Sequence, residues 1–245
     1  MEMKYFYELF RDLPRQGPGC RDATLRALSF LKDLPPKPRV LDIGCGSGMQ
    51  TQILAEELKT KITAIDNHRP LLDHLDRAAA RKGLDIETRE ISMTDMPFEI
   101  QSFDLLWAEG SIFIIGLARG LTDFRDSLKP GGYLAFTEMC WLVSEPPAEA
   151  KAYLDQVYPD IKPLDEVRRM AADSGYSVIE TFNLPESAWW DDYYTPMLGR
   201  MRELEVKNAG VAEAQAVYGA CKTEIEMFRK YSKSYGYAFF ILRRI

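Results

Sequence analysis

The feature that most constrains this chain is a glycine turn in which Gly44, Gly46 and Gly48 occupy alternate positions. The apolar run before the turn, residues 40–43, predicts a buried parallel strand, and residues 49–55 predict the start of a helix. Glycines let a ligand approach the backbone, and the first N–H groups of the helix point at it. The sequence therefore predicts a ligand site at this turn.

The spacing of the glycines separates two classes of nucleotide-derived ligand. A dinucleotide fingerprint requires glycine at the first, third and sixth positions, but the sixth position counted from Gly44 is Met49. The pattern present is an acid, Asp42, followed by glycines at alternate positions. On these residues alone, a glycine-rich turn in an unrelated α/β protein is the alternative interpretation.

Strand and helix patterns alternate from residue 22 to residue 138. Strands are expected at residues 40–43, 61–66, 85–90, 103–108 and 133–138, and helices at residues 22–34, 49–59, 70–82 and 117–128. This alternation predicts an α/β fold, a doubly wound and mostly parallel sheet with helices on both faces. In such a sheet, ligands bind beyond the carboxyl ends of the strands.

Five motifs occur in the order typical of class I S-adenosylmethionine-dependent methyltransferases, and the chain resembles this family over residues 38–139. The motifs are Asp42 to Gly48, Asp66, Asp95 before Met96-Pro97-Phe98, Phe103-Asp104 with Glu109-Gly110, and Leu128-Lys129-Pro130-Gly131-Gly132. They are most similar to those of the small-molecule (type 11) enzymes that include quinone-biosynthesis methyltransferases. The resemblance implies a Rossmann-like, seven-stranded sheet with an antiparallel last strand. It also implies methyl transfer from S-adenosylmethionine, which leaves S-adenosylhomocysteine, to a small-molecule acceptor.

The resemblance also implies which residues bind the cofactor. Asp42 would contact the amino group, the glycines would line the methionine part and ribose, and Asp66 would accept hydrogen bonds from the ribose hydroxyls. The residues assigned to cofactor binding are Asp42, Gly44, Cys45, Gly46, Gly48, Asp66, Asn67, Thr94, Asp95, Met96 and Trp107, with His68 beside the adenine. A strand-end turn is the alternative for Asp66, and Cys45 is interpreted as packing rather than redox chemistry.

Glu109 is the candidate catalytic residue, because a carboxylate just after the fourth strand can accept a proton or bind a cationic amine. A helix-capping or solvated carboxylate is the alternative. Four aromatic residues in segments expected near the mouth of the site are substrate candidates, since aromatic faces attract cations: Tyr7, Trp141, Trp190 and Tyr194. Ordinary packing is the alternative for these aromatic residues.

The organisation expected is a single domain over residues 1–245. Its core comprises about residues 22–183 and 234–245, and residues 1–21 form an N-terminal flap. An insertion over about residues 184–233 is expected as a helical lid above the site, with an outer layer or a dimer contact as the alternative. Residues 15–19 of the flap could equally be a plain linker.

Composition restricts the partners. The net charge is −6 and no dense Lys/Arg run occurs, which argues against nucleic acid as the partner. Four cysteines and two histidines form no metal-ligand pattern. The N-terminus lacks the apolar core of a signal peptide, and no run approaches a membrane span, so a cytoplasmic protein is expected. A nucleic-acid or protein methyltransferase and a non-catalytic regulator that binds S-adenosylmethionine are the alternative functions, and the sequence predicts no oligomeric state.

Overall fold

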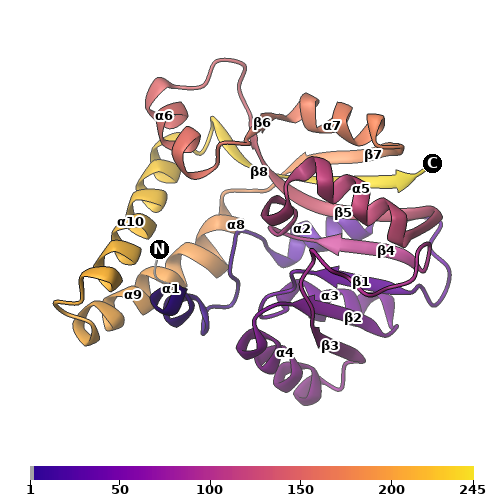
Figure 1. Ribbon diagram of the computed structural model, residues 1–245, viewed down its shortest axis with the longest axis horizontal. Helices are drawn as coiled ribbons and strands as arrows, with labels where there is room; N and C mark the ends of the chain where they lie inside the picture. The colour runs from indigo at the N-terminus through magenta and orange to yellow at the C-terminus, as the bar shows by residue number, and fades with distance from the viewer. Residues whose placement is uncertain (1–2) are drawn as a thin grey trace.

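The computed structural model describes residues 3–245, in which helices cover a central sheet (Figure 1). The strands are β1 (Val40–Ile43), β2 (Ile62–Asp66), β3 (Ile86–Glu90), β4 (Phe103–Ala108), β5 (Leu128–Trp141), β6 (Lys162–Pro163), β7 (Tyr176–Asn183) and β8 (Tyr235–Arg244). The helices are α1 (Met3–Phe10), α2 (Arg21–Leu28), α3 (Met49–Leu58), α4 (Arg69–Lys82), the 3₁₀ turn η1 (Ile112–Ile115), α5 (Leu117–Ser127), α6 (Ala148–Val157), α7 (Leu164–Asp173), α8 (Ser187–Trp189), the π turn η2 (Trp190–Tyr194), α9 (Thr195–Lys207) and α10 (Ala212–Tyr231).

The sheet has the predicted doubly wound topology. Seven strands follow the order β3-β2-β1-β4-β5-β8-β7, and the two-residue β6 pairs with the end of β5. The pairs from β3 to β5 are parallel, whereas β8 is antiparallel to both β5 and β7. The antiparallel last strand of the prediction is therefore confirmed, and β6 is an addition that the sequence pattern did not indicate.

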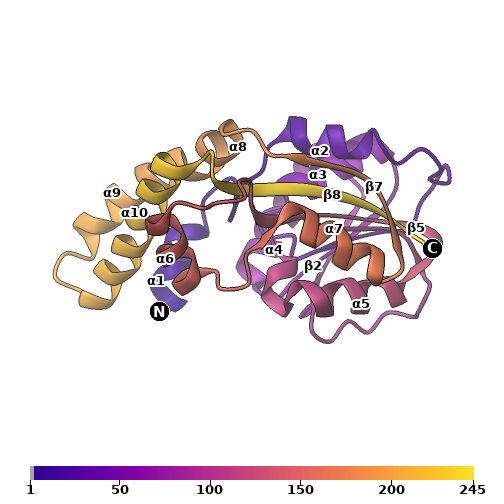
Figure 2. The ribbon, with the colours of Figure 1, turned by 90° about the horizontal axis from the view of Figure 1, so that it is seen from above.

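Two layers of helices cover the sheet, because successive side chains of a strand point to opposite faces. Val40 and Leu105 belong to the core shared with α2 and α3, while Leu41 and Leu106 belong to the core shared with α5 and α7. Figure 2 shows these two layers on either side of the strands. The near-continuous apolar runs of β1 and β4 follow from burial on both faces.

Two elements differ from the sequence prediction. Helix α2 ends at Leu28 rather than at residue 34, because the N–H groups of Phe30 and Leu31 bond three residues back and the chain continues as turns. Strand β5 begins at Leu128 and continues to Trp141, well beyond the predicted residues 133–138. The extension past residue 138 follows from the antiparallel pairing with β8, which reaches the pair of Trp141 with Tyr235. At the other end, Leu128 pairs with Phe103 of β4.

The insertion between β7 and β8 forms a helical cap, defined by α8, η2, α9 and α10. Figure 1 shows α9 and α10 together with α1 and α6 beyond the carboxyl ends of the parallel strands. Helix α1 is tied to the cap by Glu8, which accepts hydrogen bonds from Lys207 at 2.6 Å and Asn208 at 3.0 Å. Among residues 3–245, no helix combines the length and the apolar composition needed to cross a membrane.

Candidate active site

The glycine turn joins β1 to α3 at the carboxyl edge of the sheet. The N–H groups of Gly44 and Cys45 donate to the carbonyl of Ile65 at 2.8 and 2.9 Å and hold the turn against β2. Gly46 has a φ of +56°, in the left-handed region that favours glycine. A Cβ atom on Gly46 would also collide with the side-chain oxygen of Gln16. The N-terminal part of the chain therefore lies directly on the turn.

The segment that crosses the turn is residues 14–17, which we call the strap. Ser47 holds it in place: its N–H donates to Gln16 Oε1 and its hydroxyl donates to the carbonyl of Pro14, both at 2.8 Å. The strap and the glycine turn enclose a narrow cavity of about 60 Å³, which Glu109 also lines. The segment predicted as an N-terminal flap thus contacts the glycine turn through the two hydrogen bonds that Ser47 donates.

Asp42, the acid at the end of β1, is fully buried beneath the turn. Its Oδ2 accepts hydrogen bonds from the Thr51 hydroxyl at 2.5 Å and from the Gln50 amide at 3.2 Å. Its Oδ1 is buried and has no hydrogen-bond partner among the described residues. Burial raises the pKa of Asp42 to about 7, against the opposing effect of the Thr51 hydrogen bond.

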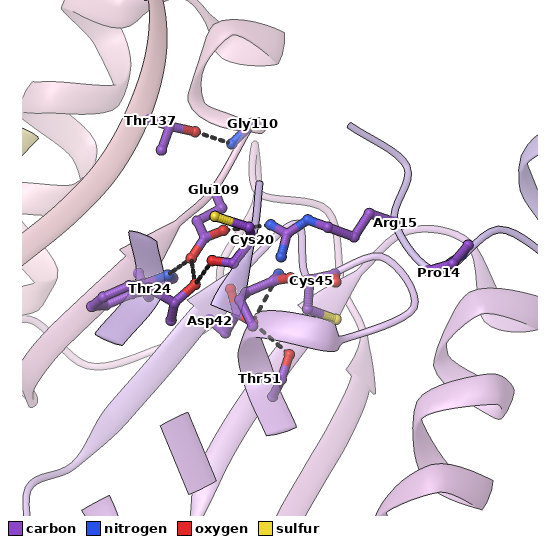
Figure 3. A network of polar contacts seen from close by, with 12 residues as sticks. Pro14, Arg15, Cys20, Thr24, Asp42, Cys45, Thr51, Glu109, Gly110 and Thr137 are labelled. Carbon is purple, nitrogen blue, oxygen red and sulfur yellow. Dashed lines mark hydrogen bonds and ion pairs between the residues drawn. The ribbon is translucent and has the colours of Figure 1, made fainter. Parts of the chain in front are cut away.

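Glu109 lies at the centre of a buried polar cluster shown in Figure 3. Its Oε1 accepts hydrogen bonds from the Thr24 hydroxyl at 2.7 Å and from the Trp107 indole N–H at 2.9 Å. Its Oε2 forms an ion pair with Nη2 of Arg15, whose side chain is 5% exposed. Both carboxylate oxygens are therefore engaged with the protein.

Arg15 has a second nitrogen, Nη1, that is buried and has no hydrogen-bond partner among residues 3–245. Figure 3 shows the guanidinium beside the Asp42 side chain, and the Arg15 charge lowers the pKa of Asp42 against the effect of burial. A buried donor and a buried acceptor without partners each cost free energy. An α-amino acid group satisfies both, since its carboxylate accepts from a guanidinium and its ammonium donates to a carboxylate. These two residues therefore fit the methionine end of S-adenosylmethionine.

The predicted ribose residue, Asp66, lies on the other side of the turn. It accepts hydrogen bonds from the N–H groups of Gly46 and His68, both at 2.9 Å, and burial raises its pKa. His68 stacks on Tyr7 with ring centroids 3.7 Å apart. Tyr7, predicted as a substrate residue, thus lies beside the strand end assigned to the adenosine part.

The residues predicted around the adenine are open to solvent. Asn67, Thr94 and Asp95 are exposed, and Met96 is partly buried. Thr94 shares a hydrogen bond of 2.7 Å with Ser92, which shapes the loop after β3. These residues lie at or after the ends of β2 and β3, as their predicted role requires.

A second, larger cavity of about 630 Å³ lies against the first, since Gln16, Gly17 and Gly110 line both. Its walls include residues of α1, α6, β5, β8 and the helical cap, and aromatic residues are the most frequent type among them. This volume is typical of sites for small molecules. Two adjoining cavities of this kind suit a group-transfer reaction, with the donor in the smaller cavity and the acceptor in the larger one.

The aromatic residues that were predicted for the site do not all lie at the larger cavity. Tyr194 lines the larger cavity. Trp190 instead packs beside Arg229, whose guanidinium lies 5.2 Å from the indole ring, and Trp141 packs against Tyr235. Neither tryptophan is among the residues that line the cavity. Trp107, predicted to bind the cofactor, is 0% exposed and reaches the site only through its hydrogen bond to Glu109.

Trp189 and Tyr193, two aromatic residues at the start of the insertion, also line the cavity. Glu224 lines it as well and was not singled out from the sequence. Glu224 carried a usable signal. It lies seven residues after Val217 and four before Phe228, and both of these face the buried side of α10. A carboxylate in an apolar stripe indicates a buried polar site.

Comparisons with known proteins agree with this geometry. Residues 40–132 match the methyltransferase domain family. Phosphoethanolamine N-methyltransferase 1 of Arabidopsis thaliana is 26% identical over 146 residues, which cover 59% of this chain and 30% of that protein. Glycine/sarcosine/dimethylglycine N-methyltransferase of Actinopolyspora halophila is 27% identical over 57% of this chain and 25% of its own length. The chain thus spans 30% or less of the length of these relatives.

A solved structure matches almost the whole chain. The S-adenosylmethionine-dependent methyltransferase from Geobacter sulfurreducens, in complex with S-adenosylhomocysteine, has a TM-score of 0.85 and covers 99% of this chain and 98% of its own. The two sequences are 20% identical, so the likeness concerns the fold. It confirms the predicted Rossmann-like methyltransferase architecture.

Proposed function

We propose that this chain, which belongs to the class I S-adenosylmethionine-dependent methyltransferases, transfers a methyl group from S-adenosylmethionine to a small-molecule acceptor. The observation that carries the proposal is the pair of buried atoms without partners in residues 3–245, Arg15 Nη1 and Asp42 Oδ1. They suit the carboxylate and the ammonium of the cofactor, beside a glycine turn that admits a ligand to the backbone.

The remaining cofactor contacts follow the ends of the strands. Asp66 accepts hydrogen bonds from the ribose hydroxyls, and Gly44, Cys45, Gly46 and Gly48 line the methionine part and ribose. The loop residues Asn67, Thr94, Asp95 and Met96 border the adenine, with His68 and its stacking partner Tyr7 beside it. This assignment rests on the family motifs and on the positions of these residues at one edge of the sheet.

The bound cofactor supplies a methyl group already activated on a sulfonium. The protein then has to hold an acceptor in line with that group and exclude water, and alignment contributes roughly 7–11 kcal/mol in favourable cases. The strap and Gly110 border both cavities, which supports a donor site and an acceptor site that adjoin each other. Helix α1 and the helical cap act as a lid that keeps water from the transfer.

Glu109 acts in this proposal as an anchor for Arg15 rather than as a proton acceptor. Its two oxygens are already bonded to Arg15, Thr24 and Trp107, and a base would have to release one of them. The ion pair fixes the guanidinium so that Nη1 stays directed at the cofactor carboxylate. Preorganised charge of this kind spares the protein a rearrangement on binding.

The size and position of the second cavity favour a small acceptor over a macromolecule. It is covered by α1, α6 and the helical cap, and a nucleic acid would require a basic surface, whereas the chain has a net charge of −6. The Arabidopsis and Actinopolyspora relatives are named as methyltransferases of small molecules, which supports the same class of acceptor.

Titration calorimetry tests the proposal. The protein should bind S-adenosylmethionine and S-adenosylhomocysteine and fail to bind NAD. Arg15→Ala should weaken S-adenosylhomocysteine roughly 10- to 100-fold, since a charge-assisted hydrogen bond contributes roughly 1.5–3 kcal/mol. The matched control is Arg11→Ala, because Arg11 is exposed and pairs with Asp12.

Binding of NAD without either sulfur compound would overturn the assignment. So would an Arg15→Ala protein that binds S-adenosylhomocysteine as tightly as the wild type. Catalysis is tested separately by the conversion of S-adenosylmethionine to S-adenosylhomocysteine in the presence of a metabolite extract. Binding without turnover would favour the non-catalytic regulator.

A further inference from the structure

A carboxylate from the helical cap faces the larger cavity. Glu224 lies on α10, and its Oε1 accepts hydrogen bonds from the hydroxyl groups of Tyr194 at 2.9 Å and Tyr193 at 3.3 Å. All three residues line the cavity. Among the hydrogen bonds of residues 3–245, none involves the other oxygen, Oε2. Glu224 therefore has an oxygen available to a ligand.

The cavity contains no positive charge that would compensate Glu224. None of the lining residues that the structure describes is Lys, Arg or His. Burial raises the pKa of Glu224, and the hydrogen bonds from the two tyrosines oppose this effect. Glu224 is half-buried, and a carboxylate that is partly removed from water without a cationic partner carries a desolvation cost. A cation in the cavity would offset that cost.

The walls add to the preference for a cation. The rings of Trp189, Tyr153, Tyr235 and Tyr237 line the cavity, and aromatic faces attract cations. Burial and the nearby carboxylates raise the pKa of Tyr237, so its hydroxyl stays neutral.

A second carboxylate, Glu138, lies behind the wall of the cavity. It is 4% exposed, and it accepts a hydrogen bond at 2.5 Å from Tyr158, which lines the cavity. Its Oε2 has no hydrogen-bond partner among the described residues. The negative charges near the cavity thus come from both the cap and the sheet.

We propose that the larger cavity binds an acceptor that carries a cationic amine on an apolar body, with Glu224 as the residue that binds the amine. The inference rests on the proposed function, since it identifies the class of molecule that the acceptor cavity takes. The apolar and aromatic lining accommodates a body much larger than the ammonium group alone, because the cavity measures about 630 Å³. An acceptor with a phosphate or carboxylate group near Glu224 would be repelled.

Three probes of one shape separate charge from size: 2-phenylethylamine, 2-phenylethanol and 3-phenylpropionate. Each is titrated into the protein of residues 1–245 saturated with S-adenosylhomocysteine. We expect the amine to bind at least about tenfold more tightly than the alcohol, because only the amine gains a charge-assisted hydrogen bond. The carboxylate should bind more weakly than the alcohol.

Glu224→Gln keeps the size of the side chain and removes its charge. It should reduce the affinity for the amine by about tenfold or more and leave the alcohol within about twofold, since the neutral probe has no ionic contact to lose. Glu226→Gln is the matched control on the same helix, because Glu226 is exposed and pairs with Arg229. This variant should bind all three probes as the wild type does.

The outcomes separate this inference from the proposed function. No binding of S-adenosylhomocysteine would defeat the proposed function itself. If the wild type binds S-adenosylhomocysteine, three results would overturn only the inference on the acceptor: equal affinity for the amine and the alcohol, no binding of the amine, or an unchanged preference in Glu224→Gln. Circular dichroism of each variant establishes that it is folded, and the comparison of probes in the wild type needs no variant.

Discussion

At the scale of single residues, the cofactor site depends on polar atoms that are buried without partners. Asp42 Oδ1 and Arg15 Nη1 both lack hydrogen bonds within residues 3–245. A buried polar atom that is left without any partner costs about 1–3 kcal/mol, and a ligand that satisfies it recovers this cost on binding. In the proposed function, these two atoms receive the amino-acid group of the cofactor.

The pKa of Asp42 makes cofactor binding depend on pH. Burial raises this pKa to about 7, so the carboxyl group is increasingly protonated below pH 7 and must lose its proton to accept a hydrogen bond from an ammonium. Affinity for S-adenosylhomocysteine should therefore fall about tenfold between pH 8 and pH 6. Calorimetry at the two pH values measures the change. Asp42→Asn should bind weakly and with little dependence on pH, and an equally steep dependence in that variant would contradict the assignment.

The role of Asp66 is tested by removing its carboxylate. Asp66→Ala should weaken S-adenosylhomocysteine by about 2–4 kcal/mol, because two hydrogen bonds to the ribose are lost. The variant also loses the hydrogen bonds from Gly46 and His68, so its thermal unfolding is measured alongside. Asp73→Ala, which removes an exposed ion pair with Arg69, is the control. An unchanged dissociation constant would mean that the ribose binds elsewhere.

At the scale of elements, the sequence predicted the bounds of those strands and helices that local patterns determine. The strands β1, β2 and β4 and the helices α3 and α4 lie within a residue or so of their predicted bounds, because apolar runs and glycine turns determine them. The length of β5 was underestimated, since its extension past residue 138 depends on pairing with β8, about a hundred residues later in the chain. The strap was predicted only as a possible flap. Its proposed role in cofactor binding depends on the contact between Arg15 and Glu109, which are 94 residues apart.

A single variant distinguishes two roles for Glu109, which either positions Arg15 or acts as a base. If Glu109 positions Arg15, Glu109→Gln should weaken S-adenosylhomocysteine about tenfold, because the guanidinium loses its ionic partner. If Glu109 is instead a base, the same variant should lower kcat and leave cofactor affinity unchanged. Calorimetry together with steady-state kinetics distinguishes the two. Glu145→Gln, at an exposed position after β5, serves as the control.

The junction of α8 with the π turn η2 supplies a matched pair of tryptophans, Trp189 and Trp190. Trp189 lines the larger cavity and stacks on Phe228 with ring centroids 4.0 Å apart, whereas Trp190 packs beside Arg229. Trp189→Ala should raise the KM for the acceptor roughly tenfold or more, because an aromatic wall of the site is lost. Trp190→Ala should change KM by less than about twofold. The reverse order of effects would show that the cap presents its other face to the acceptor.

At the scale of the whole molecule, a sheet with two helical layers places its strand ends under a cap. The fold was predicted correctly from the sequence, because it follows from the alternation of strands and helices. The sequence also assigns the ligand to the carboxyl edge of the sheet, where the proposed site lies. It did not predict the shape of the larger cavity. That cavity is formed by α1, α6, β8 and the helical cap, which come from distant parts of the chain, and its carboxylate Glu224 reaches the site only through tertiary packing.

A crystal structure of the protein with S-adenosylhomocysteine tests the central claim most directly. We expect the ligand's carboxylate on Arg15 Nη1, its ammonium on Asp42 Oδ1, and its sulfur directed toward the larger cavity where Gly17 and Gly110 border both cavities. A ligand bound away from the glycine turn would contradict this account. So would one at the turn that leaves Arg15 and Asp42 without contact to its amino-acid group.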